Sequence, residues 1–402
     1  MNTKGIDETA RWFAGKGRTI ASVRPRAAAG GLRFLDVAYA DGGSETYLDV
    51  ADDLDWGPLV ASLRARPLDG DGGRLELREG PALDPLGGAL GGRRRVPATD
   101  LSNTVVALGD ALLVKAYRRP VAGPHVEIEL LGALAGTGAP VPPFAGSLHW
   151  VDGERDTALA LLQAFVPGAE ASWERPIERA AAVIVGAAPF EDAEWTTLGC
   201  STAALHRALV DAFGLHPGGP ESLARHRAAG EVALAGAAAR DPRIAALAPA
   251  ARARLAELDD AAPPALTRIH GDLHVGQMLR IDVATPPLVI DFEGDPTRPL
   301  ADRRRPDSPL YDLACLLRCV DHVGSAAARR AAGASPVDWI AAARAAVLEG
   351  YAPRAPVPAD ADVLNLLELA KECAELVYAQ RVAPEWAYAP MASFARMLAD
   401  SG

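Results

Sequence analysis

Two acidic motifs in the second half of the chain carry the residue types that phosphoryl transfer requires. The first is HGD at 270–272, followed by Gln277, and the second is DFE at 291–293. Transfer of a phosphoryl group to a hydroxyl needs a carboxylate that orients the nucleophile, and oxygen ligands that hold magnesium beside the phosphates. Asp272 is therefore a candidate catalytic base, and Gln277 and Asp291 are candidate Mg²⁺ ligands.

The same residues allow two other interpretations. His270, Asp272 and His274 alternate along the chain and could hold zinc, but a zinc site needs a complete ligand set and leaves Lys115 without a role. In isolation, HGDLH could also be a polar turn. Because a second acidic motif follows at 291–293, we favour the catalytic-loop interpretation.

A lysine stands in the middle of a predicted strand. Residues 104–108 and 111–117 are β-rich runs separated by Gly109-Asp110, which predicts a compact hairpin. Lys115 lies among apolar residues of the second run. Taken alone, it would be interpreted as an edge lysine whose amine reaches water. The helix-like stretch 127–134 follows, with glutamates at 127 and 129.

The remaining pattern predicts strands first and helices later. The first 95 residues are strand-rich, with candidate strands at 32–40, 45–50 and 74–78, and 158–166 resembles a buried strand. Most of the later chain has helical periodicity. Ser308-Pro309 is a helix start signal, and a long helix is expected from about 362 to 381.

The amino-acid composition limits which classes of protein and partner are compatible with the sequence. The chain has 402 residues, 49% hydrophobic and 23% charged, which is ordinary for a globular protein. A net charge of −11 disfavours nucleic acid and anionic membranes as partners. The four cysteines are too few for a disulfide framework, and neither a secretory signal nor a membrane span is apparent. We expect a cytoplasmic protein.

The motifs resemble those of the aminoglycoside-phosphotransferase-like kinases, and within them the actinobacterial branch of glucosamine kinases and maltokinases. The HGD motif with Gln277, the DFE motif and DLA at 312–314 carry the resemblance. It extends over most of the chain, through SNT at 102–104, VKAYRR at 114–119, EIELLGAL at 127–134, LLQAFVPGA at 161–169, LGCSTAALH at 198–206 and RPLADRRRPDSPLYDLA at 298–314.

This resemblance implies an α+β, bilobal, protein-kinase-like fold with ATP bound between the lobes. It implies a strand-rich cap at 1–95, an intermediate nucleotide-binding subdomain with a hinge at 96–166, and a helical lobe at 167–402. The cap is characteristic of this branch.

The resemblance also assigns roles to individual residues. Lys115 would contact the α- and β-phosphates of ATP and pair with a helix glutamate, Glu129 in preference to Glu127. The turn Ser102-Asn103-Thr104 would cover the phosphates, and Gln163, Phe165 and Val166 would belong to the adenine-binding hinge. Glu293 would join Gln277 and Asp291 around Mg²⁺, and His270 and Asp312 would be structural.

Two departures from the protein-kinase pattern accompany these assignments. The chain has no G-x-G-x-x-G loop, so side chains of the 102–104 turn would have to help hold the phosphates. Gln277 also replaces the usual asparagine, which changes its reach by one methylene and keeps an oxygen ligand. Neither change excludes activity.

The acceptor is expected beside Asp272. Candidate contacts are His274, Asp307, Glu372, Glu375, Tyr378 and Trp386. Carboxylates next to aromatic rings suit a sugar, above all an amino sugar. We expect glucosamine to be converted to glucosamine 6-phosphate. Maltose, giving maltose 1-phosphate, is the alternative, and an aminoglycoside phosphotransferase or a nucleotide-binding pseudokinase is less favoured.

Overall fold

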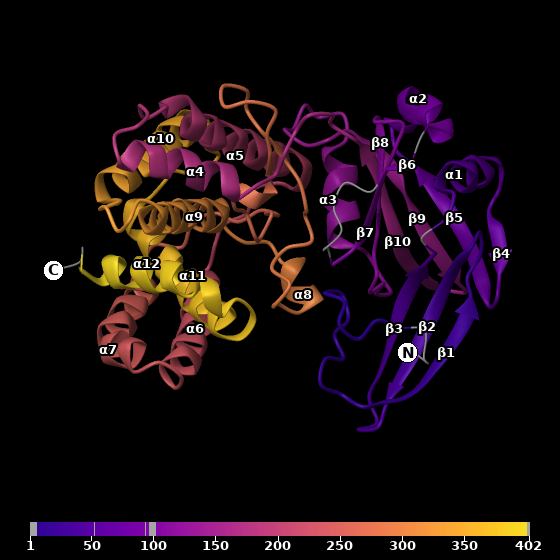
Figure 1. The fold of residues 1–402 in the computed structure, drawn as a ribbon, viewed down its shortest axis with the longest axis horizontal. Coiled ribbons are helices and arrows are strands. Elements are labelled where there is room, and N and C mark those ends of the chain that lie inside the picture. Colours follow the sequence, from indigo (N-terminus) through magenta and orange to yellow (C-terminus); the bar gives the residue numbers. More distant parts are fainter. Residues whose placement is uncertain (1–5, 52, 93, 96–101, 400–402) are drawn as a thin grey trace. The chain divides into compact units, whose positions relative to one another are not determined.

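The computed structural model describes residues 6–51, 53–92, 94–95 and 102–399. The chain divides into two compact units, one of residues 1–138 with 142–168 and the other of residues 139–141 with 169–402 (Figure 1). The first carries nearly all the strands and the second nearly all the long helices. This agrees with the change from strand pattern to helical pattern in the sequence.

Two antiparallel sheets build the N-terminal unit. The smaller sheet has the order β1-β2-β3, and the larger has the order β4-β5-β9-β10-β8-β7-β6. Their bounds are β1 Ile20–Ala27, β2 Leu32–Tyr39, β3 Ser44–Val50, β4 Leu68–Gly70, β5 Gly73–Glu79, β6 Arg94–Arg95, β7 Thr104–Leu108, β8 Leu112–Ala116, β9 Phe144–Asp152 and β10 Arg155–Ala164. Strands from both sides of residue 95 therefore pair in one sheet, and a subdomain boundary there remains a proposal.

One hydrophobic core joins these two sheets to the first helix. Helix α1 (Trp56–Ala65) buries Trp56 against side chains that include Phe34 of β2, Val114 of β8 and Leu148 of β9. The short helices α2 (Leu83–Leu86) and η1 (Gly87–Gly91) and the longer α3 (Val126–Leu134) complete the unit. A shared core means that the strand carrying Lys115 is braced by the preceding strands.

The C-terminal unit is a set of helices around one buried helix. Helix α9 (Pro309–Arg330) begins at Ser308, whose hydroxyl accepts a hydrogen bond from the amide of Leu310 at 3.2 Å, and every residue from 309 to 327 is buried. The other elements are α4 Glu174–Ile184, α5 Asp192–Phe213, α6 Pro220–Ala238, α7 Pro242–Ala256, η2 Glu257–Asp259, η3 Val275–Gln277, β11 Met278–Leu279, β12 Leu288–Val289, α8 Leu300–Arg303, α10 Val337–Tyr351, η4 Ala352–Arg354, α11 Ala361–Val382, η5 Pro384–Trp386 and α12 Tyr388–Ala399.

Helix α11 is the second organising element of this unit. It packs against α6, α9 and α12, as Figure 1 shows within the helical unit. Acidic and basic side chains of α9 and α11 are buried, so they have to pair with one another. Among the described residues, none of the helices combines the length and the apolar character needed to cross a bilayer.

Candidate active site

The loop at 270–272 is held by a buried aspartate of α9. The Asp312 carboxylate, which is 0% exposed, accepts hydrogen bonds from the amides of His270 at 2.8 Å and Gly271 at 2.7 Å. Gly271 has a φ of +84°, which a side chain would strain. His206 of α5 contacts the same carboxylate at 3.2 Å. These contacts fix the backbone immediately before Asp272.

His270 has no ring nitrogen left for a metal. Its Nδ1 accepts a hydrogen bond from the amide of Asp272 at 3.3 Å, and its Nε2 donates to the carbonyl of Ile290 at 3.0 Å. The side chain therefore links the 270–272 loop to the strand that leads into Asp291. A zinc site on His270, Asp272 and His274 would break one of these two bonds, so this alternative is not supported.

The residues predicted to hold magnesium lie together at the ends of the small β11–β12 hairpin. The Gln277 amide donates to the Asp291 carboxylate at 2.9 Å, and the amide of Ile290 donates to the carbonyl of Gln277 at 3.0 Å. Asp291 has a φ of +69°, a left-handed conformation that is costly for a residue other than glycine and often marks a functional position.

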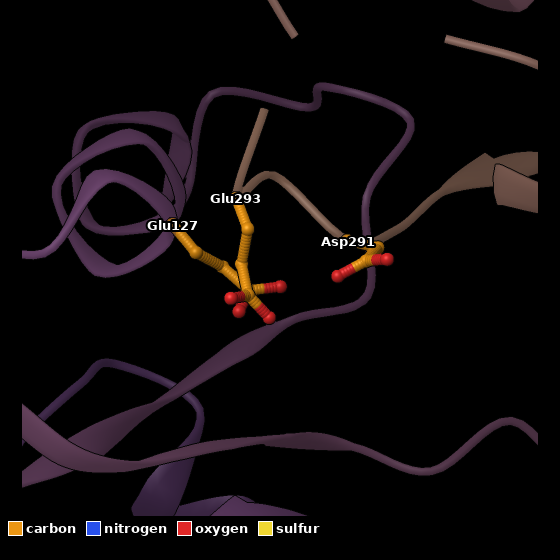
Figure 2. Close-up of side chains that lie close together, drawn as sticks. All are labelled: Glu127, Asp291 and Glu293. Carbon is orange, nitrogen blue, oxygen red and sulfur yellow. The ribbon is translucent and has the colours of Figure 1, made fainter. Parts of the chain in front are cut away.

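Glu293 reaches the same place two residues later. Its carboxylate and that of Asp291 have oxygens within 4.8 Å of each other, and Figure 2 shows both side chains on the loop after β12. An amide oxygen and two carboxylates are the ligands that Mg²⁺ prefers. The residues present thus fit a magnesium site.

A buried lysine of α11, which the sequence reasoning missed, contacts Asp272. The ammonium of Lys371 lies 3.4 Å from Asp272, 2.8 Å from Asp295 and 3.4 Å from Glu375. Burial alone would lower the pKa of Lys371, but Tyr311 and these carboxylates raise it well above its usual value. One permanent cation therefore joins the candidate base to two further carboxylates.

Glu375 has the weakest contacts with donor groups of the carboxylates in this cluster. Arg318 of α9 lies 3.6 Å from it and Lys371 lies 3.4 Å away, both too long or poorly aligned to be strong hydrogen bonds. Burial would raise the pKa of Glu375, but the charges of Arg318 and Lys371 outweigh it and lower the pKa to about 2. Among the described residues, no side chain or amide donates a hydrogen bond to this ionised carboxylate.

Glu372 is tied into a second set of contacts. The fully buried Glu372 carboxylate accepts a hydrogen bond from His322 Nε2 at 2.9 Å, and the opposite nitrogen of His322 lies 3.3 Å from the Arg318 guanidinium. Arg318 therefore bridges Glu375 and His322. Because Glu372 already has His322 as its partner, it is suited to positioning His322 and Arg318.

Aromatic rings line the neighbouring surface. Trp173 lies 5.4 Å from the His274 ring and 5.9 Å from the Trp386 ring, measured between centroids. A side chain at Gly276 would collide with both Trp173 and His274, so glycine is needed there. Within the described part of the chain, His274 Nδ1 is buried without a hydrogen-bond partner, and burial lowers the His274 pKa.

Two predicted acceptor residues lie elsewhere. The Asp307 carboxylate is buried and accepts hydrogen bonds from His226 at 2.9 Å and from the amide of Ser308 at 2.9 Å. Tyr378 is 36% exposed and, like Asp307, lines a separate pocket against α6. Asp307 was expected to bind an ammonium. Because its carboxylate already accepts these hydrogen bonds, it has less capacity for a ligand, and its role at the acceptor stays a prediction.

In the N-terminal unit, Lys115 pairs with Glu127. The Lys115 ammonium lies 2.9 and 3.1 Å from the two carboxylate oxygens, and the Tyr117 hydroxyl donates to the same group at 2.8 Å. The preference for Glu129 as the partner was wrong. Glu127 is on the buried stripe of α3 with Val126 and Leu130, and Figure 2 shows it projecting from this helix.

The other residues predicted to bind nucleotide also belong to this unit. The Asn103 amide oxygen accepts from the amide of Arg118 at 3.4 Å, and the Arg118 guanidinium reaches the Thr104 hydroxyl at 3.5 Å, which anchors the 102–104 turn to the segment after β8. Gln163, one residue before the end of β10, is in register with Leu113. The Phe165 amide donates to the carbonyl of Ala111 at 2.7 Å, so this amide is already used within the unit.

A lysine–glutamate pair, a loop aspartate and a second acidic loop are the working parts of protein-kinase-like phosphotransferases. The chain belongs to the phosphotransferase enzyme family, whose model matches residues 94–356.

The similar proteins are more specific. A glucosamine kinase from Streptacidiphilus jiangxiensis is 32% identical over 321 residues, which cover 75% of this chain and 72% of that protein. A glucosamine kinase from Mycolicibacterium smegmatis is 29% identical, covering 75% and 79%. A glucosamine kinase structure in complex with glucosamine, ADP and inorganic phosphate superposes with a TM-score of 0.71 at 26% identity, covering 98% of both chains. The expected kinase-like fold is confirmed.

Proposed function

We propose that the protein transfers the γ-phosphoryl group of ATP to the primary hydroxyl of glucosamine and forms glucosamine 6-phosphate. The similar proteins are glucosamine kinases, and one of them has been solved with glucosamine and ADP. The observation in this chain that carries the proposal is the sign of the charge around Asp272. Maltose, the alternative acceptor, has no support from these relatives.

The cluster around Asp272 has an excess of negative charge. Among the described residues, the carboxylates of Asp272, Asp295 and Glu375 share two permanent cations, Lys371 and Arg318, while Glu372 is paired with His322. The three carboxylates therefore outnumber the two cations in a partly desolvated place, where the excess negative charge interacts strongly with a further cation. A neutral disaccharide would leave that excess uncompensated, whereas the ammonium of an amino sugar would reduce it.

Glu375 is our candidate for the ammonium partner. It is ionised, 22% of its side chain is exposed, and it has acceptor capacity that no described donor uses. A charge-assisted hydrogen bond to a ligand would add to the loose ion pairs that it already makes. The sugar ring would lie against Trp386 and Trp173, and the unpartnered His274 Nδ1 would contact a sugar hydroxyl.

In the chemical step, the oxygen of the primary hydroxyl attacks the γ-phosphorus of ATP. The bond from that phosphorus to the bridging oxygen breaks, ADP leaves with the electron pair, and Asp272 takes the hydroxyl proton. Lys371 keeps the Asp272 carboxylate in place. Gln277, Asp291 and Glu293 would hold Mg²⁺, which supplies charge neutralisation at the phosphates.

For the nucleotide, we propose the residues of the N-terminal unit. Lys115, held by Glu127, would contact the α- and β-phosphates, and the 102–104 turn would cover them. Gln163 and Val166 would contribute hinge groups that recognise adenine. The Phe165 amide is excluded from this role by its bond to Ala111, so Phe165 would contribute its carbonyl or its ring.

The direct test is ADP release with ATP and Mg²⁺ over glucosamine, glucose, maltose and an aminoglycoside. We expect glucosamine to have the highest kcat/KM and the product to be glucosamine 6-phosphate, identified by ³¹P NMR. Removal of Mg²⁺ with a chelator should abolish turnover. Preference for maltose, or for the aminoglycoside, would refute the acceptor assignment and leave the kinase assignment in place.

A further inference from the structure

The helical unit has a large pocket on the side of α11 where α6 packs. It has a volume of ≈ 930 Å³ and is lined by α6, by α11 and by the loop and short helix between residues 295 and 311. Asp272, His274, Glu375 and Trp386 do not belong to its lining. None of the residues assigned above to phosphoryl transfer or to the ammonium faces it, apart from Lys371 and Asp295 in the shared wall.

The pocket lining has the opposite charge from the cluster around Asp272. Five basic and three acidic side chains line it, an excess of two positive charges in a chain whose net charge is −11. Each acid is already paired: Asp295 with Lys371 at 2.8 Å, Asp302 with Arg305 at 2.9 Å and Asp307 with His226 at 2.9 Å. The acids therefore offer little to an incoming cation.

Three guanidinium groups keep unused donors. Arg225 lies 3.7 Å from Asp307, beyond hydrogen-bond distance, and its Nη2 is buried without a hydrogen-bond partner among the described residues. Arg298 donates one bond, to the Tyr311 hydroxyl at 2.7 Å. Arg381 has no hydrogen-bond or ion-pair partner within the part of the chain that the structure describes. A guanidinium has five N–H donors, so this lining has a large donor surplus.

The pocket also has an apolar side. Eight large apolar or aromatic side chains in the described residues are exposed, and three of them, Val232, Tyr378 and Val382, line this pocket at 76%, 36% and 63% exposure. Small residues of α6 and α11, such as Ala229 and Ala374, form the surface between them. Such a surface suits the carbon face of a ring, with an anionic group placed among the arginines.

We propose that this pocket binds the phosphate monoester of a sugar. A phosphate dianion accepts several hydrogen bonds at once and fits planar guanidinium donors, and the ring would cover Val232 and Tyr378. Lys371 also lines the pocket, but three carboxylates already neutralise it. The site would take a product-like anion, whereas the cluster around Asp272 would take the cationic acceptor.

The test is isothermal titration calorimetry with glucose 6-phosphate, which has the phosphate but no ammonium, in the presence of saturating glucosamine. Wild type should bind one equivalent. The double variant Arg225→Ala/Arg381→Ala should bind at least about tenfold more weakly. Arg252→Ala removes an exposed arginine of α7 outside the pocket and should bind as wild type does. Arg381→Lys should retain part of the affinity.

Arg381→Ala alone keeps the test valid if loss of Arg225 disturbs folding, because the Arg381 side chain is exposed on α11. Unphosphorylated glucose should not bind under these conditions. Equal affinity of wild type and the double variant, or no binding of glucose 6-phosphate in the millimolar range while glucosamine is saturating, would each overturn the proposal. These outcomes do not depend on which acceptor the enzyme phosphorylates.

Discussion

Two lysines serve the two halves of this protein, and their contacts with carboxylates differ. Lys115 in the strand unit lies within 3.1 Å of both oxygens of the Glu127 carboxylate. Lys371 in the helical unit has three carboxylate neighbours, with one short contact at 2.8 Å and two at 3.4 Å. The first contact uses both oxygens of one carboxylate, and the second lysine is shared among several carboxylates.

This difference indicates what each lysine can do for a ligand. The contact with both Glu127 oxygens holds the Lys115 ammonium in one place. A lysine shared by three carboxylates cannot neutralise them all, so the cluster stays attractive to another cation. The predictions below separate the two sites in order of expected effect.

The largest effect should come from Asp272→Asn. The amide cannot accept the hydroxyl proton, so kcat should fall by about 10²–10⁴. Nucleotide affinity should stay within about twofold, because Lys115 and Glu127 are untouched; the measurements are steady-state turnover and calorimetric ADP binding. Asp362→Asn, at an exposed position on the same helix as Lys371 but outside the cluster, is the control for the loss of one carboxylate charge. Near-normal turnover in folded Asp272→Asn would show that Asp272 is not the catalytic base.

Lys115→Met and Lys371→Met should both destabilise the protein, but a second substitution should restore the stability of the two variants to different extents. Each leaves buried carboxylate charge without its cation, at a cost of about 3–5 kcal/mol in the free energy of unfolding. Adding Glu127→Gln should restore much of the loss for Lys115→Met, since the Glu127 carboxylate lies 2.9 Å from the Lys115 ammonium. A single neutralisation, such as Asp295→Asn, should restore less for Lys371→Met.

Urea denaturation of the four variants measures this contrast. Lys115→Met/Glu127→Gln should also have a raised KM for ATP with an unchanged KM for glucosamine. If one neutralisation rescued both lysine variants equally, the cluster around Lys371 would be a simple pair and the argument from excess charge would fail.

Glu375→Gln should change specificity more than rate. Loss of one charge-assisted hydrogen bond of about 1.5–3 kcal/mol should lower the ratio of kcat/KM for glucosamine to that for glucose by about tenfold to a hundredfold. Glu385→Gln, an exposed carboxylate in the same part of the chain, should leave the ratio unchanged. An unaltered ratio in Glu375→Gln would show that another carboxylate recognises the ammonium.

The sequence predicted those parts of the site that lie close together along the chain. HGD, Gln277 and DFE fall within 24 residues, and the β11–β12 hairpin brings them together as expected. The Lys115 hairpin was also predictable from alternation and the Gly109-Asp110 turn. These features depend on local periodicity and turn chemistry, which one sequence contains.

The errors concern side chains whose partners come from distant elements. Glu127 and Glu129 differ only in helical face, and the choice required knowing that α3 begins at Val126. Lys371 lies 99 residues from Asp272 and resembled one more charge on a long helix. The available signal was a lysine directly after the mainly apolar stretch 366–370, which indicates a charge that could be buried and in need of partners. Strand β9, beside β10, was not predicted at all.

The smallest expected effect is the pH dependence of glucosamine affinity, and it tests the state of Glu375 directly. Because the cations around Glu375 lower its pKa to about 2, the carboxylate should remain ionised as pH falls from 7 to 4, and KM for glucosamine should change less than twofold. An ordinary glutamate, with a pKa of about 4.3, would begin to lose its charge in that range. On the alkaline side, KM should rise as the ammonium of the substrate deprotonates near pH 8, as for an α-amino group. KM for glucose, which has no ammonium, should stay flat on that side and serves as the control. A rise of KM for glucosamine centred between pH 4 and 5, without loss of folding by circular dichroism, would show that Arg318 and Lys371 do not hold Glu375 as an anion.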